Sequence, residues 1–151
     1  MIAEINGKIS RSGSNLGENL EDNLTGNIFG TLRYAPFNKI VKPLLQNSVQ
    51  SQQIKDIINK IDCDYWAENI EFWPYDEFGE LDISMNFDDV IIGIEVKYLS
   101  GLSSNDQLER EAKIINKNAG QRKKILLLIA NENYCLEIVT EDRKQAILQK
   151  T

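Results

Sequence analysis

The sequence of 151 residues contains no histidine and only two cysteines. The absence of histidine excludes the histidine-containing serine and cysteine triads, histidine zinc sites and histidine general bases. Any hydrolytic chemistry must therefore use carboxylates, lysine, tyrosine or a metal ion. Cys63 and Cys135 do not form a redox or metal-binding spacing, so we expect two buried free thiols.

The sequence also lacks a long apolar run. No stretch approaches the ~18 apolar residues of a membrane span, and residues 1–14 lack the basic and apolar regions of a signal peptide. With 42% hydrophobic and 26% charged residues, the composition is that of an ordinary soluble protein. We expect one cytoplasmic domain over residues 1–151, with residues 1–14 as a loose arm or short edge strand.

Hydrophobic periodicity predicts helices in the first half of the chain. Over residues 15–34 an apolar residue recurs every fourth position, which predicts a helix with a buried stripe of Leu16, Leu20, Leu24, Ile28 and Leu32. Residues 38–62 are predicted to be helical, with a break near Pro43. Ser51 is the expected cap of the second part, whose buried positions are Ile54, Ile57, Ile58 and Ile61.

The second half of the chain predicts a sheet with one intervening helix. The predicted strands cover residues 69–75, 80–87, 90–99, 124–130 and 134–140. The continuous apolar run of residues 124–130 is typical of a strand buried on both faces and parallel to its neighbour. Helices are predicted over residues 104–118 and 141–149, the first burying Leu108, Ala112, Ile115 and Ala119. The fold class is therefore α/β, with a mixed central sheet flanked by helices.

The pair of strands over residues 80–87 and 90–99 carries the candidate site. If Asp88 and Asp89 form the turn, Phe87 pairs with Val90 and Asp82 falls opposite Glu95. The same register places Leu81, Ile83, Met85 and Phe87 on one apolar face, and Asp82, Glu95 and Lys97 on the other. Two like charges in opposed positions destabilise a sheet unless a cation, a proton or a function compensates them.

A divalent metal ion is the compensation that we favour. Two carboxylates and the carbonyl group of Val96 would give Mg²⁺ or Mn²⁺ the oxygen ligands that it prefers, and Lys97 would position or activate water. Two plainer interpretations stay open. A Glu-x-Lys pair on a strand is often two solvated charges, and Glu80 falls opposite Lys97, where a cross-strand ion pair would form.

The sequence at these positions resembles the PD-(D/E)XK nuclease superfamily, the restriction-endonuclease-like proteins. The resemblance rests on Asp82, on Glu95-Val96-Lys97 after twelve intervening residues that include an apolar run, and on the αβββαβ order of elements over about residues 15–131. One departure is that Leu81, and not proline, precedes the aspartate. The resemblance implies a restriction-endonuclease-like core and metal-dependent hydrolysis of phosphodiester bonds, most often in DNA.

The resemblance also implies two supporting residues. An acidic residue of the first helix often joins the metal ligands, and Glu21 is the candidate because it adjoins the predicted stripe. A polar residue often comes from the helix after the lysine strand, and Gln107 is the match. A solvated helix charge for Glu21 and a capping box of Ser104 with Gln107 are the plainer interpretations.

Three basic residues are candidates for nucleic-acid contacts. Arg110 lies one helical turn after Gln107, and Lys123 and Lys124 belong to the only compact basic run, although such residues are usually solvated. The net charge of −6 argues mildly against tight nonspecific binding of nucleic acid. The resemblance therefore implies a nuclease that acts on DNA, with RNA not excluded and with a homodimer or a partner subunit possible. The alternative is an inactive module of the same fold that binds nucleic acid or protein.

Overall fold

The computed structural model describes residues 16–98, 102 and 106–131. The predicted arm over residues 1–14, the strand over 134–140, the helix over 141–149 and Cys135 lie outside the described residues. The helices are α2 (Leu16–Leu32), the π-helix η1 (Phe37–Val41), α3 (Lys42–Ser48), α4 (Gln52–Asn59) and α5 (Gln107–Ala119). The strands are β1 (Ile70–Phe72), β2 (Tyr75–Asp76), β3 (Gly79–Glu80), β4 (Ile83–Asn86), β5 (Val90–Lys97) and β6 (Lys123–Ala130).

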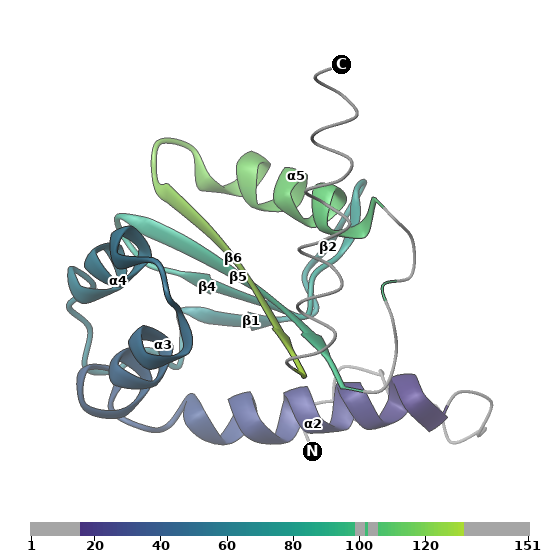
Figure 1. The fold of residues 1–151 in the computed structure, drawn as a ribbon, viewed down its shortest axis with the longest axis horizontal. Helices are drawn as coiled ribbons and strands as arrows, with labels where there is room; N and C mark the ends of the chain where they lie inside the picture. The colour runs from purple at the N-terminus through teal and green to yellow at the C-terminus, as the bar shows by residue number, and fades with distance from the viewer. Residues whose placement is uncertain (1–15, 99–101, 103–105, 132–151) are drawn as a thin grey trace.

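Four strands form a mixed sheet in the order β1-β4-β5-β6, and β2 and β3 form a separate two-stranded ribbon. The β1–β4 and β4–β5 pairs are antiparallel, whereas β6 runs parallel to β5. Helices α3 and α4 lie on one side of this sheet and α5 on the other, while α2 passes the ends of β5 and β6 (Figure 1). The predicted mixed α/β class is therefore confirmed.

The register predicted for the β4–β5 hairpin is confirmed along its described ladder. Ile83 pairs with Ile94 and Met85 with Ile92, and the N–H group of Phe87 donates to the carbonyl oxygen of Val90 across the Asp88-Asp89 turn at 2.9 Å. The alternation of apolar residues and the short polar turn together fix this register, because a slip of one residue would turn every side chain to the opposite face.

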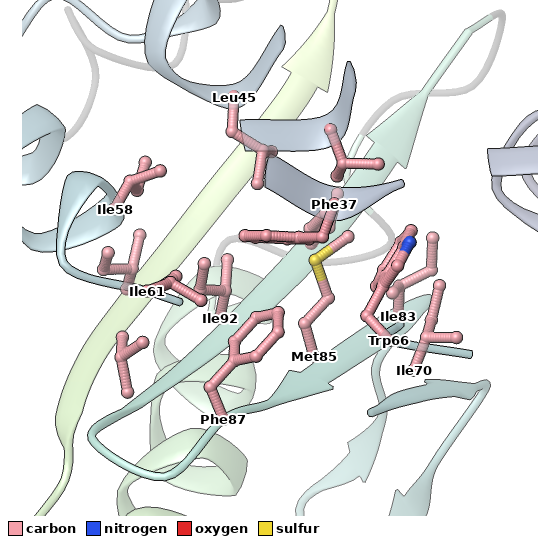
Figure 2. Close-up of a cluster of buried hydrophobic side chains, with 14 of the residues drawn as sticks. Phe37, Leu45, Ile58, Ile61, Trp66, Ile70, Ile83, Met85, Phe87 and Ile92 are labelled. Carbon is pink, nitrogen blue, oxygen red and sulfur yellow. The ribbon is translucent and has the colours of Figure 1, made fainter. Parts of the chain in front are cut away.

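The α3–α4 side of the sheet forms the main hydrophobic core (Figure 2). The even positions of β5 lie in this core with Ile83, Met85 and Phe87 of the hairpin. Phe37 and Trp66 pack edge to face with ring centroids 5.6 Å apart, and the Nε1 group of Trp66 donates to the carbonyl oxygen of Ala35 at 3.0 Å. Both rings are fully buried, so this cluster supplies most of the apolar burial that holds the sheet.

The opposite side of the sheet carries a smaller apolar cluster, formed by Leu81, Ile91, Ile114, Ile115 and Ala119. Gly93 lets α5 approach β5 closely at this point, since a Cβ atom there would collide with the side chain of Ile115. This approach brings the first turns of α5 against the last residues of β5.

Leu81 belongs to this second cluster, so the prediction that it shares a face with Ile83 and Met85 is wrong. The alternation breaks because the chain leaves the ladder before Ile83. The N–H group of Leu81 donates to the carbonyl oxygen of Pro74 at 3.1 Å, which ties it to the β2–β3 ribbon and not to β5. The predicted strand over residues 80–87 is therefore two short strands, β3 and β4, separated at Leu81 and Asp82.

The buried side of α2 also differs from the prediction. Leu20 and Ile28 are about half exposed, at 48% and 47%, whereas Glu21, Thr25 and Phe29 are buried. An α-helix repeats every 3.6 residues, so a strict four-residue spacing drifts around the helix and cannot stay on one buried face.

The helices between α2 and the sheet agree with the prediction in part. The Ser51 side chain caps α4, accepting a hydrogen bond from the N–H group of Ile54 at 3.4 Å, as predicted. The expected break near Pro43 corresponds to the boundary between η1 and α3, and Pro43 lies in the first turn of α3, where its missing N–H group costs no helical hydrogen bond. A further break falls between Ser48 and Gln52.

Strand β6 runs parallel to β5, as predicted. Among the residues that the structure describes, it is only partly buried. Ile125 is buried, whereas Ile129 is 43% exposed. Cys63 is a free thiol of intermediate exposure whose Sγ atom donates to the carbonyl oxygen of Tyr65 at 3.2 Å. In the described parts of the chain, no helix combines the length and apolar character needed to cross a membrane.

Candidate functional site

Asp82 lies where the chain passes from the β2–β3 ribbon into β4. Its Oδ2 atom accepts a hydrogen bond from the N–H group of Val96 at 2.8 Å, which holds the carboxylate against β5. Its carbonyl oxygen accepts from the N–H group of Trp73 at 2.9 Å. Trp73 adopts a φ of 50°, a conformation that a bulky residue avoids unless the surrounding structure imposes it. The position of Asp82 is therefore fixed from both sides.

Glu95 and Lys97 lie two residues apart on β5 and project from the same face. The Nζ atom of Lys97 lies 2.7 Å from Oε1 of Glu95 in an ion pair whose side chains are 11% and 4% exposed. The predicted ion pair of Lys97 with Glu80 is wrong, because β3 pairs with β2, where Glu80 lies opposite Tyr75. The break before Ile83 removes Glu80 from the ladder of β5.

Gln107 opens α5 and reaches the strand. Its Nε2 group donates to Oε1 of Glu95 at 2.6 Å and to Oε1 of Glu111 at 2.7 Å. Gln107 is buried, with Asp106 at the N-cap position and Ser104 outside the described residues. Gln107 therefore lies in contact with Glu95, and its supporting role stays a prediction.

Glu111 is the residue that sequence reasoning missed. It is only 2% exposed, and it lies with Gln107 on the buried face of α5. Leu108 and Ala112, which were expected on that face, are only half-buried. The signal was present in the spacing, because residues four apart on a helix lie on one face and Gln107 was already a candidate. A glutamate in that position is ordinarily solvated, so nothing local predicts its burial.

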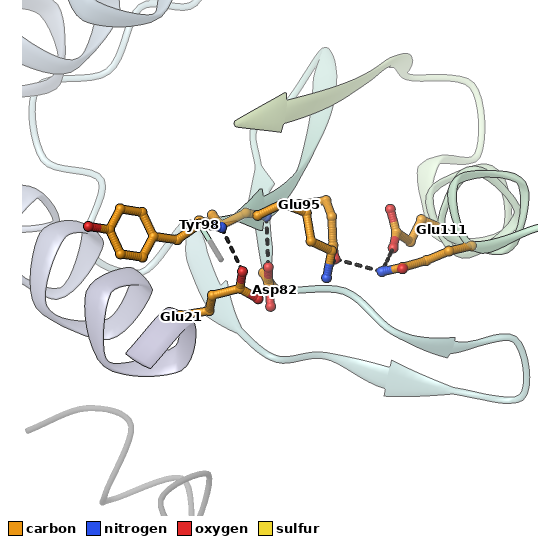
Figure 3. Close-up of polar contacts among 8 residues, drawn as sticks. Glu21, Asp82, Glu95, Tyr98 and Glu111 are labelled. Carbon is orange, nitrogen blue, oxygen red and sulfur yellow. Dashed lines mark hydrogen bonds and ion pairs between the residues drawn. The ribbon is translucent and has the colours of Figure 1, made fainter. Parts of the chain in front are cut away.

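Glu21 reaches the site from α2, and its predicted role as a metal ligand stays a prediction. It is 7% exposed, and its Oε1 atom accepts from the N–H group of Tyr98, just after β5, at 2.6 Å. Figure 3 shows its carboxylate beside that of Asp82, with Glu95 and Glu111 following in a row across the end of the sheet. We call this group, formed by Glu21, Asp82, Glu95, Lys97, Gln107 and Glu111, the polar layer.

The polar layer holds more negative charge than its own lysine neutralises. Burial, and then the charge of Glu95, raise the pKa of Asp82 to about 7, against the opposing hydrogen bond from Val96. Burial and the charge of Glu95 likewise raise the pKa of Glu111 to about 8. Oε1 of Glu95 and Oε1 of Glu111 both accept from Nε2 of Gln107, which holds the two carboxyl groups close together. The layer therefore retains protons near neutral pH when no cation is bound.

Lys97 is a cation in this setting. Burial alone would lower its pKa, but the hydrogen bond to Glu95 and the charges of Glu95, Asp82 and Glu21 outweigh burial and raise the pKa. The ammonium group can therefore donate hydrogen bonds and stabilise negative charge, whereas it cannot accept a proton while it is paired with Glu95.

The donor set of the polar layer fits a hard divalent cation. Carboxylate oxygens are the ligands that Mg²⁺ prefers, and this ion commonly takes only one or two carboxylates and keeps several waters. Within the described ranges, no three acidic or cysteine side chains converge on one point as a complete metal cage. The residues that would hold the ion are Asp82 and Glu95, with the carbonyl group of Val96. The positive charge of such an ion would lower the raised pKa values of the carboxyl groups.

The basic candidates are placed in two different regions. Arg110 lies beside the polar layer, where its Nη1 group donates to the carbonyl oxygen of Phe78 at 3.4 Å and its Nε group pairs with Asp106. Arg110, Gln107 and Glu111 line a cavity of about 180 Å³ under the β2–β3 ribbon. Lys123 and Lys124 begin β6 and lie beside Val90 and Ile91, at the opposite end of β5 from Glu95.

Comparisons with protein-family models, with curated proteins and with solved structures found no significant match. The structure defines a mixed α/β fold, with one four-stranded sheet and helices on both of its faces. Its candidate site is the polar layer at the end of β5.

Proposed function

We propose that this protein is a metal-dependent nuclease of the restriction-endonuclease-like kind, which hydrolyses phosphodiester bonds in DNA. The observation that carries the proposal is the crowding of Asp82, Glu95 and Glu111 in a buried layer with one lysine. A fold gains no stability from buried carboxylates that must hold protons near neutral pH, so the arrangement indicates a function that uses their charge.

Each residue of the layer has a distinct role in this proposal. Asp82 and Glu95 hold Mg²⁺ or Mn²⁺, with the carbonyl group of Val96. Bound there, the ion would lower the pKa of a water molecule and neutralise charge on the phosphate group. Lys97 positions the attacking water and stabilises the charge that develops on the phosphate oxygens, a role that suits an ammonium group of raised pKa.

The other three residues position this constellation. Gln107 holds Glu95 and Glu111 through its two hydrogen bonds, so that Glu95 keeps one orientation. Glu21 fixes the end of β5 through the N–H group of Tyr98 and supplies a further carboxylate beside Asp82. Arg110 is close enough to the layer to contact a phosphate group after a change of rotamer.

One observation favours a second function, an inactive module of the same fold that binds nucleic acid or protein. Oε1 of Glu95 already has two partners, Lys97 at 2.7 Å and Gln107 at 2.6 Å, so the layer partly neutralises itself without an added cation. Such a module would bind its partner without metal-dependent turnover.

The experiment that separates the two is incubation of the protein with single- and double-stranded DNA, and with RNA, in the presence of Mn²⁺ or Mg²⁺. A nuclease cleaves at least one substrate, and Asp82→Asn abolishes cleavage. Asp88→Asn, which changes an exposed aspartate in the turn of the same hairpin, is the matched control and retains activity. Absence of metal-dependent cleavage on every substrate would favour the inactive module.

Metal binding can be measured independently of turnover. An ion that binds only the folded state stabilises it by about 2.7 kcal/mol at one hundred times the dissociation constant. We expect Mn²⁺ to raise the melting temperature of the protein and of Asp88→Asn, but not that of Asp82→Asn. An equal rise in all three would place the ion outside the polar layer.

A further inference from the structure

Two cavities lie at the end of β5 opposite to the polar layer. One, of about 660 Å³, is bounded by the residues after α4, the Asp88-Asp89 turn and the start of β6. The other, also of about 660 Å³, lies along α4 and β6. They share Ile57, Lys60 and Lys123, so they form one continuous depression, which we call the α4–β6 groove.

Three lysines, Lys60, Lys123 and Lys124, line the part of this groove along α4 and β6. All three are exposed, and within the described parts of the chain none of them forms an ion pair. Their ammonium groups are therefore available to an anionic ligand. Lys123 lies five residues before Leu128, the partner of Glu95, so the groove begins about 17 Å along the sheet from the polar layer.

The neighbouring arginine has a different role. Arg122 donates to the carbonyl oxygens of Asn118, Ala119 and Phe87, at 2.6, 3.1 and 3.2 Å. These bonds close the turn between α5 and β6 and fasten it to the β4–β5 hairpin, which sets where Lys123 and Lys124 begin the strand. Of the compact basic run, only the two lysines can therefore bind a ligand.

The acidic residues of the groove are unevenly distributed. Asp62, Asp88 and Asp89 line the cavity at the hairpin turn. Along α4 and β6, Asp56 is the only acidic lining residue among those that the structure describes, and it already accepts a hydrogen bond from Gln52 at 2.8 Å. An extended anion would therefore be attracted along the α4–β6 side and repelled at the turn.

We propose that the α4–β6 groove binds the phosphate groups of a nucleic-acid backbone and holds it remote from the polar layer. The identity of the anion rests on the proposed nuclease function, while the site itself rests on the lysines and the cavity. Lysine ammonium groups bind phosphates as point charges and do not read base sequence, so the groove adds affinity and not specificity.

The test is the salt dependence of binding to a double-stranded oligonucleotide, measured by fluorescence anisotropy in EDTA so that no cleavage occurs. The variant is Lys60→Gln with Lys123→Gln. Each lost phosphate contact lowers the slope of log affinity against log salt by about 0.9, so we expect a slope smaller by about 2 and affinity ~10-fold weaker at low salt. Lys39→Gln with Lys113→Gln removes the same charge outside the groove and is the matched control.

The outcomes separate this site from the proposed function. Restoration of the slope by Lys60→Arg with Lys123→Arg supports a phosphate site, whereas an unchanged slope or an equal loss in the control overturns it. Binding to vesicles of anionic lipid but not to the oligonucleotide would also overturn it. EDTA removes the metal ion, so binding through the groove is measured even if the protein cleaves no substrate. If the groove does not bind nucleic acid, the protein can still cleave at saturating substrate.

Discussion

The two faces of the sheet bury very different chemistry. The α3–α4 side is apolar from Phe87 at the hairpin to Val96 near the end of β5. The α5 side begins with a small apolar cluster around Ile91 and Ile115 and ends in buried charges around Glu95 and Glu111. The apolar face stabilises the fold, and part of that stability offsets the cost of burying carboxylates on the other face.

Helix α5 contains both halves of this contrast. Its last turns carry Ile114, Ile115 and Ala119 against β5, and its first turn carries Gln107. Because the apolar half is held tightly at Gly93, the polar half is presented to Glu95 at a fixed distance. A site on a rigid element of this kind keeps its geometry better than a site on a loop.

The largest effect on stability is expected on the apolar face. Phe37→Ala removes a fully buried ring that packs on Trp66 and Phe87, so we expect the free energy of unfolding to fall by about 3–5 kcal/mol in urea denaturation. Tyr34→Ala, at a ring that is 71% exposed, should change it by less than about 0.5 kcal/mol. Equal effects of the two variants would refute the assignment of the main core.

On the polar face the large effect should fall on activity. Lys97→Ala removes the cation of the layer, and we expect the rate of metal-dependent DNA cleavage to fall about 10²–10³-fold, the cost of losing one stabilising donor in an active site. Lys113→Ala removes an exposed lysine of α5 and serves as control. If Lys97→Ala cleaves DNA at the same rate as the unchanged protein, Lys97 has no role in the mechanism.

The junction of the two faces can be tested at Gly93. Gly93→Ala places a methyl group where Ile115 packs, so we expect a loss of about 1–3 kcal/mol in the free energy of unfolding. If α5 moves outward to relieve the collision, cleavage should fall as well, because Gln107 moves away from Glu95. The cost of combining Gly93→Ala with Ile115→Ala should be smaller than the sum of the two single costs, and additive costs would place the collision elsewhere.

A smaller effect is expected from the proton balance of Glu111. Its pKa is raised in the folded state, so its contribution to stability is complete below its ordinary pKa and is lost as pH rises through about 8. In EDTA, Glu111→Gln should therefore be more stable than the unchanged protein at pH 8.5, by about 1 kcal/mol after allowance for solvent screening, and not at pH 4. Urea midpoints at both pH values measure this difference.

The control for that prediction is Glu109→Gln, an exposed glutamate on the same helix whose carboxylate pairs with Lys113. It should show no gain of stability at pH 8.5. If Glu111→Gln loses as much stability as the unchanged protein when the pH is raised, the effect belongs to Asp82, whose pKa is raised to about 7.

Sequence reasoning recovered the parts of the fold that follow from local alternation and short turns. The β4–β5 register followed from apolar residues at every second position and a two-residue polar turn, whereas Asp82 lies outside the paired residues and is held by the N–H group of Val96. The parallel direction of β6 followed from its continuous apolar run and the helix before it. The hairpin register is local, so the chain specifies it without reference to the rest of the fold.

The errors arose where tertiary contacts decide. Leu81 changed faces because its N–H group bonds to Pro74 in the ribbon. Glu21 was selected beside a stripe that is partly exposed, so its placement was right although the stripe was wrong. Glu111 was missed because its burial depends on how closely α5 approaches Gly93. Apart from the four-residue spacing of Gln107 and Glu111, these contacts leave no periodic pattern in the sequence.

The hydrogen bond from Tyr98 to Glu21 joins residues 77 positions apart. The site therefore draws on the first described helix, on the middle strands and, through Glu111, on α5. A chain still emerging from the ribosome would hold only fragments of it until α5 had been synthesised and packed. The polar layer would thus be complete only once α5 has packed, and circular permutants cut between α2 and β5 would keep the layer only if the two segments still dock.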